Sequence, residues 1–342
     1  MSAKVNVGVI GAGRIGKLHA ENLAYRVPEA NIIAIADILL EAAERCAADL
    51  QIPSAVKDYR EIMENPDIQA VIICSSTDTH AWMIEEAAAA GKHIFCEKPI
   101  DFDLTRIDKA LEAVDKAGVK LQVGFNRRFD PNFKRVRETV AAGKIGTPHI
   151  LRITSRDPGP PPIEYIKVSG GIFLDMTIHD FDMARYLIGS EVNEIYASGG
   201  VMVDPEIGQA GDIDTTVITL RFENGTIGTI DNSRRAVYGY DQRVEVFGSE
   251  GMVAVSNNTP DTAIYSNAEG VHSSLPLFFF VERYTEAYVA EMKEFIECIQ
   301  RDRTPSVTGI DGRIPVVMGY AAMKSYEENR PVKLSEIEGH QT

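Results

Sequence analysis

A glycine-rich turn near the start of the chain has the residue types and spacing needed to bind a dinucleotide. Gly11-Ala12-Gly13-Arg14-Ile15-Gly16 is a GxGxxG sequence between an apolar run, residues 5–10, and a helix-compatible stretch. Such glycines allow a tight turn and a close approach of the backbone to a pyrophosphate, which also faces the N-terminus of the following helix. A GxGxxG alone is equally compatible with an ordinary tight turn, so the prediction depends on its context. The residues expected to bind the cofactor here are Gly11, Gly13, Arg14, Ile15 and Gly16.

A second group could perform acid–base chemistry. Residues 170–189 are mostly apolar and helix-compatible, and they carry Asp175, His179 and Asp182 at spacings of four and three. On one continuous helix these side chains fall on one stripe. A carboxylate one turn before a histidine can orient the ring and fix its tautomer, as a general base requires. A solvent-facing stripe is the alternative. A histidine with two acids could also bind a metal, but the sequence supplies no further dedicated ligands, and we expect no metal.

Charged residues stand at the ends of two strand-like runs. Asp37 ends the second run, 21 residues after Gly16. A carboxylate there accepts hydrogen bonds from an adenosine ribose and repels a 2′-phosphate, which predicts NAD rather than NADP. The alternative for Asp37 is a helix N-cap. Glu97-Lys98-Pro99 follows residues 93–96, and a lysine at the carboxyl edge of a parallel sheet would point toward the nicotinamide. The alternative is a surface pair of Glu97 with Lys98.

Small polar and aromatic side chains are further candidates. Ser75, Thr77 and His80 follow another strand-like run and could contact the cofactor at the carboxyl edge of the sheet. Side chains of residues 77–79 could instead cap the next helix, and His80 could hydrogen-bond at the helix start. The tyrosines of Tyr238-Gly239-Tyr240-Asp241 suit a polyol, which offers only neutral donors and acceptors. Aromatic packing at a strand end is the alternative for both.

The elements that must position these residues change character near residue 147. Before that point short apolar runs alternate with amphipathic stretches, which predicts a parallel sheet with helices on both faces. The expected strands are residues 5–10, 31–36, 70–73, 93–96 and 120–123. The expected helices are residues 14–25, 39–49, 59–65, 79–90 and 104–117.

After residue 147 the pattern predicts a largely antiparallel sheet. The expected strands are residues 149–155, 192–197, 215–222, 226–232, 243–247 and 252–255. Asn224-Gly225 between two of them is typical of a type I′ hairpin. Helices are expected over residues 284–301 and around 316–327. The proline-rich residues 158–162 predict a stiff loop.

Composition limits the classes of protein. At roughly 150 residues per domain, 342 residues predict about two domains. A formal net charge of −15 disfavours nucleic acid and anionic lipid as partners. No apolar run approaches the roughly 18 residues of a membrane span, and no leader sequence is evident, so we expect a cytoplasmic protein. The cysteines include no CxxC pair, which disfavours disulfides and a thiolate zinc site; they are Cys46, Cys74, Cys96 and Cys298.

Taken in this order, GxGxxG, Asp37, Glu97-Lys98-Pro99 and Asp175…His179 resemble the Gfo/Idh/MocA oxidoreductase family, over essentially the whole chain. Three longer stretches resemble the inositol 2-dehydrogenases of bacteria within that family; they are residues 123–130, 155–158 and 173–182.

The resemblance implies a two-domain α/β protein. Residues 1–124 would form a Rossmann domain with a doubly wound parallel sheet that binds NAD. Residues 125–342 would form an α/β domain with a large, open, mostly antiparallel sheet for substrate binding and oligomerisation, with the C-terminal helix packed back on the first domain. Members are commonly homotetramers packed through that sheet.

The resemblance also implies the roles of individual residues. Lys98, Asp175 and His179 would form the substrate-site triad for NAD-dependent oxidation of a ring alcohol of a cyclic polyol, myo-inositol. Glu97 and Lys98 would also lie near the cofactor. The polyol would be contacted by Asn126, Arg127, Ser155, Asp157, Tyr238 and Tyr240, in addition to Asp175 and His179.

Two alternatives stay open. Some inositol dehydrogenases carry His–Arg–Asn where this chain has Ser155-Arg156-Asp157, so scyllo-inositol or a hexose is an alternative substrate. Some members of the family regulate sugar genes without catalysis, so a dinucleotide-binding sensor is an alternative of another class. The presence of Lys98, Asp175 and His179 together favours an enzyme.

Overall fold

The computed structural model describes residues 4–338, and the chain divides into two compact units. Unit 1 is formed by Met1–Phe129 with Glu286–Val316, and unit 2 by Asp130–Thr285 with Val317–Thr342. The domain boundary expected from the sequence was a single one, after residue 124. In the structure the first segment of unit 1 ends slightly later, and a second segment from the C-terminal part of the chain belongs to the same unit. No helix within residues 4–338 is long and apolar enough to cross a membrane.

Unit 1 is built on a six-stranded sheet in which every neighbouring pair is parallel. The strand order is β3-β2-β1-β4-β5-β6, with β1 Val5–Ile10, β2 Ala30–Ala36, β3 Ala55–Val56, β4 Ala70–Ile73, β5 His93–Glu97 and β6 Leu121–Gly124. Strand β4 shows why the runs are apolar throughout: all four of its residues are 0% exposed, because both faces of the sheet are covered.

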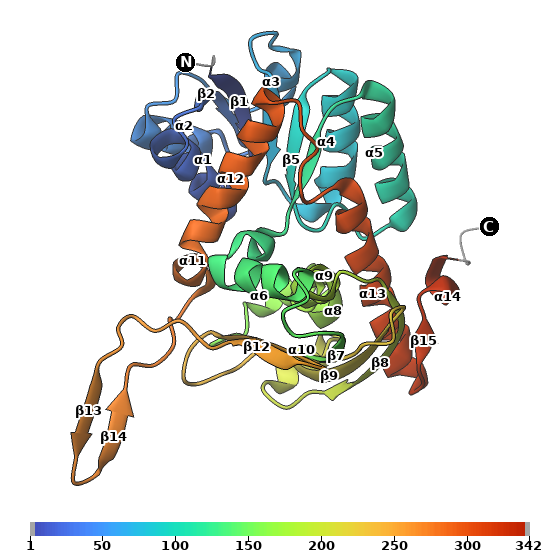
Figure 1. Ribbon diagram of the computed structural model, residues 1–342. Helices are drawn as coiled ribbons and strands as arrows, with labels where there is room; N and C mark the ends of the chain where they lie inside the picture. The colour runs from blue at the N-terminus through green and yellow to red at the C-terminus, as the bar shows by residue number, and fades with distance from the viewer. Residues whose placement is uncertain (1–3, 339–342) are drawn as a thin grey trace. The chain divides into compact units, whose positions relative to one another are not determined.

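Helices cover both faces of this sheet. They are α1 (Arg14–Arg26), α2 (Leu40–Leu50), α3 (Arg60–Glu64), α4 (Thr77–Ala89), α5 (Leu104–Ala117) and α12 (Thr285–Gln300). Figure 1 shows α1, α2 and α12 on one side of the sheet and α4 and α5 on the other. The expected doubly wound parallel sheet is therefore confirmed.

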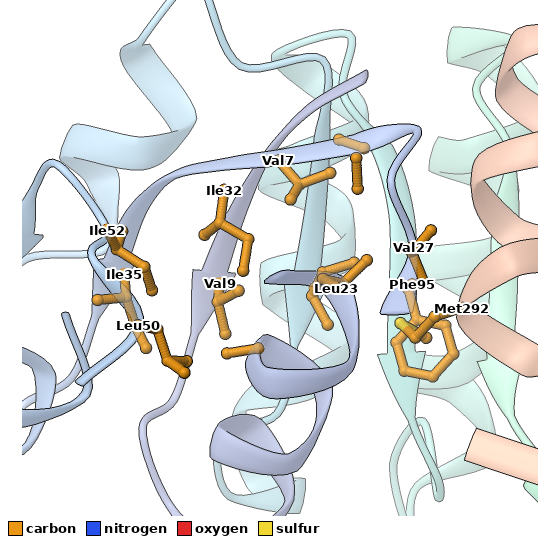
Figure 2. Packing of buried hydrophobic residues seen from close by; sticks show 14 of the residues in the cluster. Val7, Val9, Leu23, Val27, Ile32, Ile35, Leu50, Ile52, Phe95 and Met292 are labelled. Atoms are coloured by element: carbon orange, nitrogen blue, oxygen red, sulfur yellow. The ribbon is translucent and has the colours of Figure 1, made fainter. Parts of the chain in front are cut away.

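One apolar cluster joins the sheet to the helices on the first side (Figure 2). Val9 of β1 and Ile35 of β2 lie in it with Leu23 of α1. Met292 of α12 is also a member, although it is distant in sequence. A large apolar side chain contributes about 1.5–3 kcal/mol when it is fully buried. Burial of this helix face therefore packs α12 against the N-terminal segment.

A buried acid lies on the same helix. Glu291 of α12 is 0% exposed, and its main-chain oxygen accepts a hydrogen bond from Gln122 Nε2 at 3.0 Å. Neither carboxyl oxygen has a hydrogen-bond partner among the described residues. Burial raises the pKa of Glu291 well above its usual range, and the charges of Glu97 and Glu294 raise it further. The folded protein therefore favours the protonated form of this carboxyl group.

Unit 2 contains a seven-stranded sheet in the order β12-β11-β7-β10-β9-β8-β15. Its strands are β7 Pro148–Arg156, β8 Val192–Gly200, β9 Thr215–Phe222, β10 Ile227–Ser233, β11 Asp241–Gly248, β12 Gly251–Val255 and β15 Val332–Lys333. Only β7 and β10 pair in parallel; the other neighbours are antiparallel. The large, mostly antiparallel second sheet is confirmed.

Strands β9 and β10 form the expected hairpin, but the expected turn type is wrong. Type I′ requires positive φ at both central residues, whereas only Gly225 (φ +87°) has it and Asn224 does not. The amide of Phe222 donates to Thr226 O and the amide of Gly225 donates to Phe222 O. The loop is thus longer than two residues, and a glycine in the left-handed region ends it, which is the usual three-residue solution.

Helices pack on one face of the unit 2 sheet. The unit contains α6 (Pro131–Ala141), α7 (Ile163–Ile166), α8 (Gly171–Asp175), α9 (Ile178–Ile188), α10 (Pro205–Gln209), α11 (Phe280–Arg283), the second part of α13 (Gly309–Glu328) and α14 (Ser335–Glu338). In Figure 1, α6, α8 and α9 lie over one face, here called the covered face, while the hairpin of β13 (Ile264–Asn267) and β14 (Gly270–Ser273) extends away from the sheet.

The opposite face of the unit 2 sheet, here called the open face, is partly apolar. Along β9 the residues alternate, with Val217, Thr219 and Arg221 exposed and the intervening residues buried. This alternation is typical of an antiparallel sheet with one face packed on a core.

Helix α6 was absent from the sequence prediction, although Asp130 caps it by accepting from the amides of Asn132 and Phe133.

We expect Glu291→Gln to become progressively stabilising, relative to the wild type, as the pH rises from 5 to 8. Below the usual pKa of 4.5 both folded and unfolded chains hold the proton. Above it the unfolded chain ionises while the folded protein keeps the proton. The wild type therefore loses free energy of unfolding at up to about 1.4 kcal/mol per pH unit until its raised pKa is reached. Glutamine has no proton to lose.

Melting temperatures of both proteins across this pH range measure the effect. Glu286→Gln is the matched control, because Glu286 lies on the same helix with its side chain 69% exposed beside Arg26. Its effect should be small and nearly independent of pH. A constant difference between Glu291→Gln and the wild type at every pH would contradict a protonated Glu291.

Candidate functional site

The loops that follow the parallel strands of unit 1 meet at one edge of the sheet. The amide of Gly11 donates to Ala36 O at 2.8 Å, and the amide of Cys74 donates to Ile10 O at 2.8 Å. The ends of β1, β2 and β4 are therefore adjacent. This edge is where ligands bind in open α/β sheets.

The three glycines of the first loop have different roles. Gly11 has φ +101°, and a Cβ there would lie 2.5 Å from Cys74 O. A Cβ on Gly16 would lie 1.9 Å from Gly11 O. A Cβ on Gly13 would meet nothing within 4 Å. Two glycines are thus required by the packing of the protein itself, whereas Gly13 keeps open space beside the turn. That is the arrangement that lets a pyrophosphate approach the backbone.

Asp37 is anchored beside this turn. Its Oδ2 accepts from the amide of Ala12 at 2.7 Å, and its Oδ1 accepts from the amide of Leu39 at 2.8 Å. Helix α2 has Leu39 as its N-cap, so Asp37 is not the N-cap residue that the alternative proposed. The carboxylate therefore lies directly next to the glycine turn, as a ribose-binding acid requires.

The loop after β4 is tied to the segment after β5. His80 is 2% exposed; its Nδ1 lies 2.8 Å from Pro99 O and its Nε2 lies 3.0 Å from Ser75 O. The N-cap of α4 is Ser76, with no side-chain capping bond, and the Ser75 hydroxyl is bonded to that of Thr79 at 2.6 Å. The buried His80 side chain thus connects the loop after β4 to the segment after β5. Its contact with a cofactor, like that of Ser75 and Thr77, stays a prediction.

Glu97 ends strand β5, and Lys98 follows it in a different environment. Glu97 Oε1 lies 2.6 Å from Nε2 of His19, a residue that is 0% exposed. A Cβ on Gly124 would lie 2.9 Å from Glu97 Oε2, so the glycine makes room for this carboxylate. Lys98 is half-buried. The Glu97 side chain is therefore directed into unit 1, where it contacts the buried His19. The alternative, an exposed pair of Glu97 with Lys98, does not describe this environment of Glu97.

Two predicted substrate residues also belong to unit 1. Asn126 and Arg127 follow β6 in a 3₁₀ turn, Asn126–Phe129, and are 3% and 5% exposed. Asn126 Nδ2 is buried without a hydrogen-bond partner among the described residues. A buried amide donor of this kind is costly unless something pairs with it. It is consistent with a donor kept for a ligand.

In unit 2, the prediction of one continuous helix over residues 170–189 is wrong. Helix α8 ends at Asp175 and α9 begins at Ile178. Asp175 and His179 therefore lie on two helices joined by an irregular turn, and Asp182 is fully buried rather than on a common stripe. The spacing of four residues therefore does not determine how the side chains of Asp175 and His179 are oriented relative to each other.

A tertiary contact explains the break. The amide of Thr177 donates to Ile172 O, five residues back, at 2.8 Å, which is a wider turn than an α-helix makes. The Thr177 hydroxyl donates to Asn232 Oδ1 at 2.6 Å, and Asn232 Nδ2 donates to Asp180 Oδ2 at 2.8 Å. Asn232 of β10 therefore holds Thr177 and Asp180, the residues on either side of His179 at the start of α9.

The Asp175 carboxylate is held from two directions. Tyr165 donates its hydroxyl hydrogen to Oδ1 at 2.8 Å, and Arg234 Nη1 donates to Oδ2 at 3.2 Å. Burial and the charge of Asp175 raise the pKa of Tyr165, so its hydroxyl remains a donor. Tyr165, Asn232 and Arg234 are site residues that the sequence pattern did not predict. The last two lie at the carboxyl end of a strand, the signal that identified residues in unit 1.

Ser155 and Tyr240 lie in a buried polar group on the covered face of the unit 2 sheet. Ser155 is 0% exposed and its Oγ lies 3.0 Å from Gln242 Nε2. The Tyr284 hydroxyl donates to Gln242 Oε1 at 3.3 Å. The Tyr240 ring packs edge-on against that of Tyr284, with centroids 6.0 Å apart. The aromatic-packing alternative therefore describes part of the environment of Tyr240.

Tyr238 is placed elsewhere. Its hydroxyl donates to Asp241 Oδ2 at 2.6 Å and accepts from Arg156 Nη1 at 3.2 Å. Arg156 also bonds Asp231. Asp157 joins neighbouring strands through its main chain, with its amide donating to Ser233 O at 2.9 Å. The Tyr238 hydroxyl therefore lies beside the charged group formed by Arg156, Asp231 and Asp241. Residues 4–338 contain no group of three His, Cys, Asp or Glu side chains arranged to hold a metal.

Two segments of the chain match family models. Residues 5–125 match the model described as oxidoreductase family, NAD-binding Rossmann fold. Residues 133–254 match the model described as GFO/IDH/MocA C-terminal domain. The open space at Gly13 and the anchored Asp37 lie within the part that matches the NAD-binding model, so the residues present fit NAD.

Individual relatives align over nearly the whole chain. A protein of Thermotoga maritima named myo-inositol 2-dehydrogenase is 52% identical over 335 residues, covering 98% of this chain and 100% of the relative. A scyllo-inositol 2-dehydrogenase (NAD(+)) of Bacillus subtilis is 40% identical, covering 98% and 97%. The crystal structure of a myo-inositol dehydrogenase from Lactobacillus casei in complex with NAD(H) and myo-inositol superposes with a TM-score of 0.87 at 27% identity, covering 96% of each chain.

Gly13→Ala is expected to weaken NAD binding by at least about tenfold while leaving the fold intact. Gly13 has φ −70°, which alanine adopts freely, and its Cβ would meet no protein atom. The added methyl group would instead occupy the space beside the turn. Gly16→Ala is the contrasting variant, because its Cβ would overlap Gly11 O and destabilise the fold.

Titration calorimetry with NAD and melting temperatures of the three proteins make the comparison. Wild-type NAD affinity in Gly13→Ala would show that the pyrophosphate does not approach this turn.

Proposed function

Because this chain belongs to the Gfo/Idh/MocA oxidoreductase family, we propose that it oxidises a ring hydroxyl of myo-inositol to the ketone, with NAD as the hydride acceptor. The observation that carries the proposal is the Asp175 carboxylate, which Tyr165 and Arg234 hold beside the turn leading to His179. A non-catalytic dinucleotide sensor has no need of an acid fixed in this way. The names of the relatives supply the substrate.

The catalytic roles follow from the chemistry of each side chain. His179 takes the proton of the reacting hydroxyl as general base. Asp175 orients the imidazole, so that the accepting nitrogen faces the substrate. Lys98 stabilises the negative charge that grows on the oxygen as the proton leaves. Bound NAD supplies the acceptor for the hydride that leaves the ring carbon.

The cofactor would be bound by residues at one edge of the unit 1 sheet. Gly13 leaves space for the pyrophosphate and Asp37 accepts hydrogen bonds from the adenosine ribose. A charge at Asp37 disfavours a 2′-phosphate and hence NADP. The other proposed cofactor contacts are Gly11, Arg14, Ile15, Gly16, Ser75, Thr77, His80, Glu97 and Lys98.

The proposed polyol contacts differ in how well their environments support them. Asn126 has the strongest support, because its amide donor is buried and unpaired among the described residues. The hydroxyl of Ser155 is already bonded to Gln242, so a substrate would share this hydroxyl with Gln242. The remaining proposed contacts are Arg127, Asp157, Tyr238 and Tyr240. Of the proposed function, the choice of myo-inositol as the inositol isomer has the least support, since relatives include both myo- and scyllo-inositol dehydrogenases.

We also propose that the protein acts as a cytoplasmic homotetramer in inositol breakdown. The open face of the unit 2 sheet exposes four large apolar side chains, which favours burial against another copy; they are Val217, Ile227, Phe247 and Met252. All four cysteines are free, as expected in a reducing compartment.

Purified protein is expected to produce NADH faster with myo-inositol than with scyllo-inositol or hexoses. His179→Ala should lower kcat for myo-inositol by about 10²–10⁴-fold, the usual contribution of a general base. Its NAD affinity should stay near the wild-type value, because the glycine turn and Asp37 belong to unit 1. Initial rates over a substrate panel, with NAD titrations of each variant, measure these effects.

His272→Ala is the matched control, since it removes an exposed histidine from the same unit. It should keep wild-type kcat. NADH production with a hexose alone would reassign the substrate, and absence of turnover with every compound would favour the sensor. Near-normal kcat in His179→Ala would exclude His179 as the base.

A further inference from the structure

Arg234 is a buried arginine of unit 2 that contacts Asp175, a proposed catalytic residue. It follows the last residue of β10 and is 1% exposed. Its Nη1 donates to Asp175 Oδ2 at 3.2 Å, and its Nη2 lies 3.6 Å from Asp212 Oδ2. Its amide donates to Asp214 O at 2.9 Å, which fixes the backbone from which the side chain extends.

The contacts of Arg234 restrict how Asp175 can turn. With Arg234 on Oδ2 and Tyr165 on Oδ1, each carboxylate oxygen has a donor on a different element. Asp212 is itself fixed, because its Oδ1 accepts from the amide of Ile172 in α8 at 3.0 Å. Arg234 therefore lies between two acids that both belong to or contact helix α8. Asp175 is the last residue of α8, and Asp212 accepts a hydrogen bond from the amide of Ile172 in that helix.

Stability alone does not account for this arginine. Its Nε and Nη2 are buried without hydrogen-bond partners among the described residues. A buried cation with unsatisfied donors is costly, and replacing a buried ion pair with apolar groups is often neutral or stabilising. The burial of Arg234 is better explained by its effect on the neighbouring Asp175 carboxylate, to which it donates a hydrogen bond.

We propose that Arg234 is a positioning residue for the oxidation, one that acts through Asp175 by fixing the direction of its carboxylate. The inference rests on the proposed function, in which Asp175 orients His179. Arg234 itself takes no proton and needs no contact with the substrate.

A double-mutant cycle separates this role from a general effect on folding. Arg234→Met should lower kcat by about 100-fold, the loss expected when a catalytic group is misplaced by about 1 Å, with little change in NAD affinity. In an Asp175→Asn background the same substitution should cause little further loss, because the group it positions is already missing. Arg234→Lys should recover part of the activity, since it keeps the charge but not the fork of donors.

Arg283→Met is the matched control. Arg283 is also buried in unit 2 and pairs with a buried acid, Asp130. Its effect on kcat should combine multiplicatively with that of Asp175→Asn. Circular dichroism and melting curves confirm that each variant is folded at the assay temperature.

Three results would overturn the inference. One is a loss from Arg234→Met that is as large in the Asp175→Asn background as in the wild type. A second is Arg234→Lys no more active than Arg234→Met. The third is a crystal structure of Arg234→Met in which the Asp175 carboxylate keeps its direction, a result that is independent of the substrate. A wild type without turnover on any inositol would count against the proposed function instead, and the crystal structure would still decide the role of Arg234.

Discussion

Parallel pairing of strands is the constraint on which the candidate residues of each unit depend. In unit 1, parallel β1, β2, β4 and β5 must end at the same edge of the sheet, which brings the glycine turn, Asp37 and Lys98 to neighbouring loops. The seven-stranded sheet of unit 2 has a single parallel pair, β7 with β10. The carboxyl ends of that pair carry Ser155 on one strand and Asn232 on the other, and Arg234 follows directly.

A buried titratable side chain is the second common feature. Unit 1 contains the fully buried Glu291, with Glu97 near enough to raise its pKa further. Unit 2 contains the buried Arg234 between Asp175 and Asp212. Each group is costly to desolvate, and each adjoins a residue assigned to cofactor or substrate. The apolar cores of the two units supply the stability that allows such groups to remain buried.

The sequence predicted the regular parts of the fold for a physical reason. Strands buried on both faces must be continuously apolar, so β1, β2, β4 and β5 were recognisable without tertiary information. Helix α6 could also have been found, because Asp130-Pro131 is a strong start signal. The two-residue strands β3 and β15 carry too few residues to form a pattern.

Features set by distant partners could not be predicted in this way. The break between α8 and α9 depends on Thr177 bonding to Asn232, 55 residues away. The Asp175 environment depends on Arg234, 59 residues away. The GxGxxG sequence indicated a cofactor turn, but only the structure shows that its glycines differ in role. A Cβ at Gly13 would meet no protein atom, whereas a Cβ at Gly16 would overlap the backbone of the turn itself.

The central claim is that hydride passes directly from a ring carbon of inositol to bound NAD. Oxidation of myo-inositol deuterated at the reacting carbon, followed by mass spectrometry of the NADH formed, tests it most directly. The account predicts one deuterium in each NADH molecule and none released to water, because His179 takes only the hydroxyl proton. NADH without deuterium, or deuterium in the solvent, would contradict it.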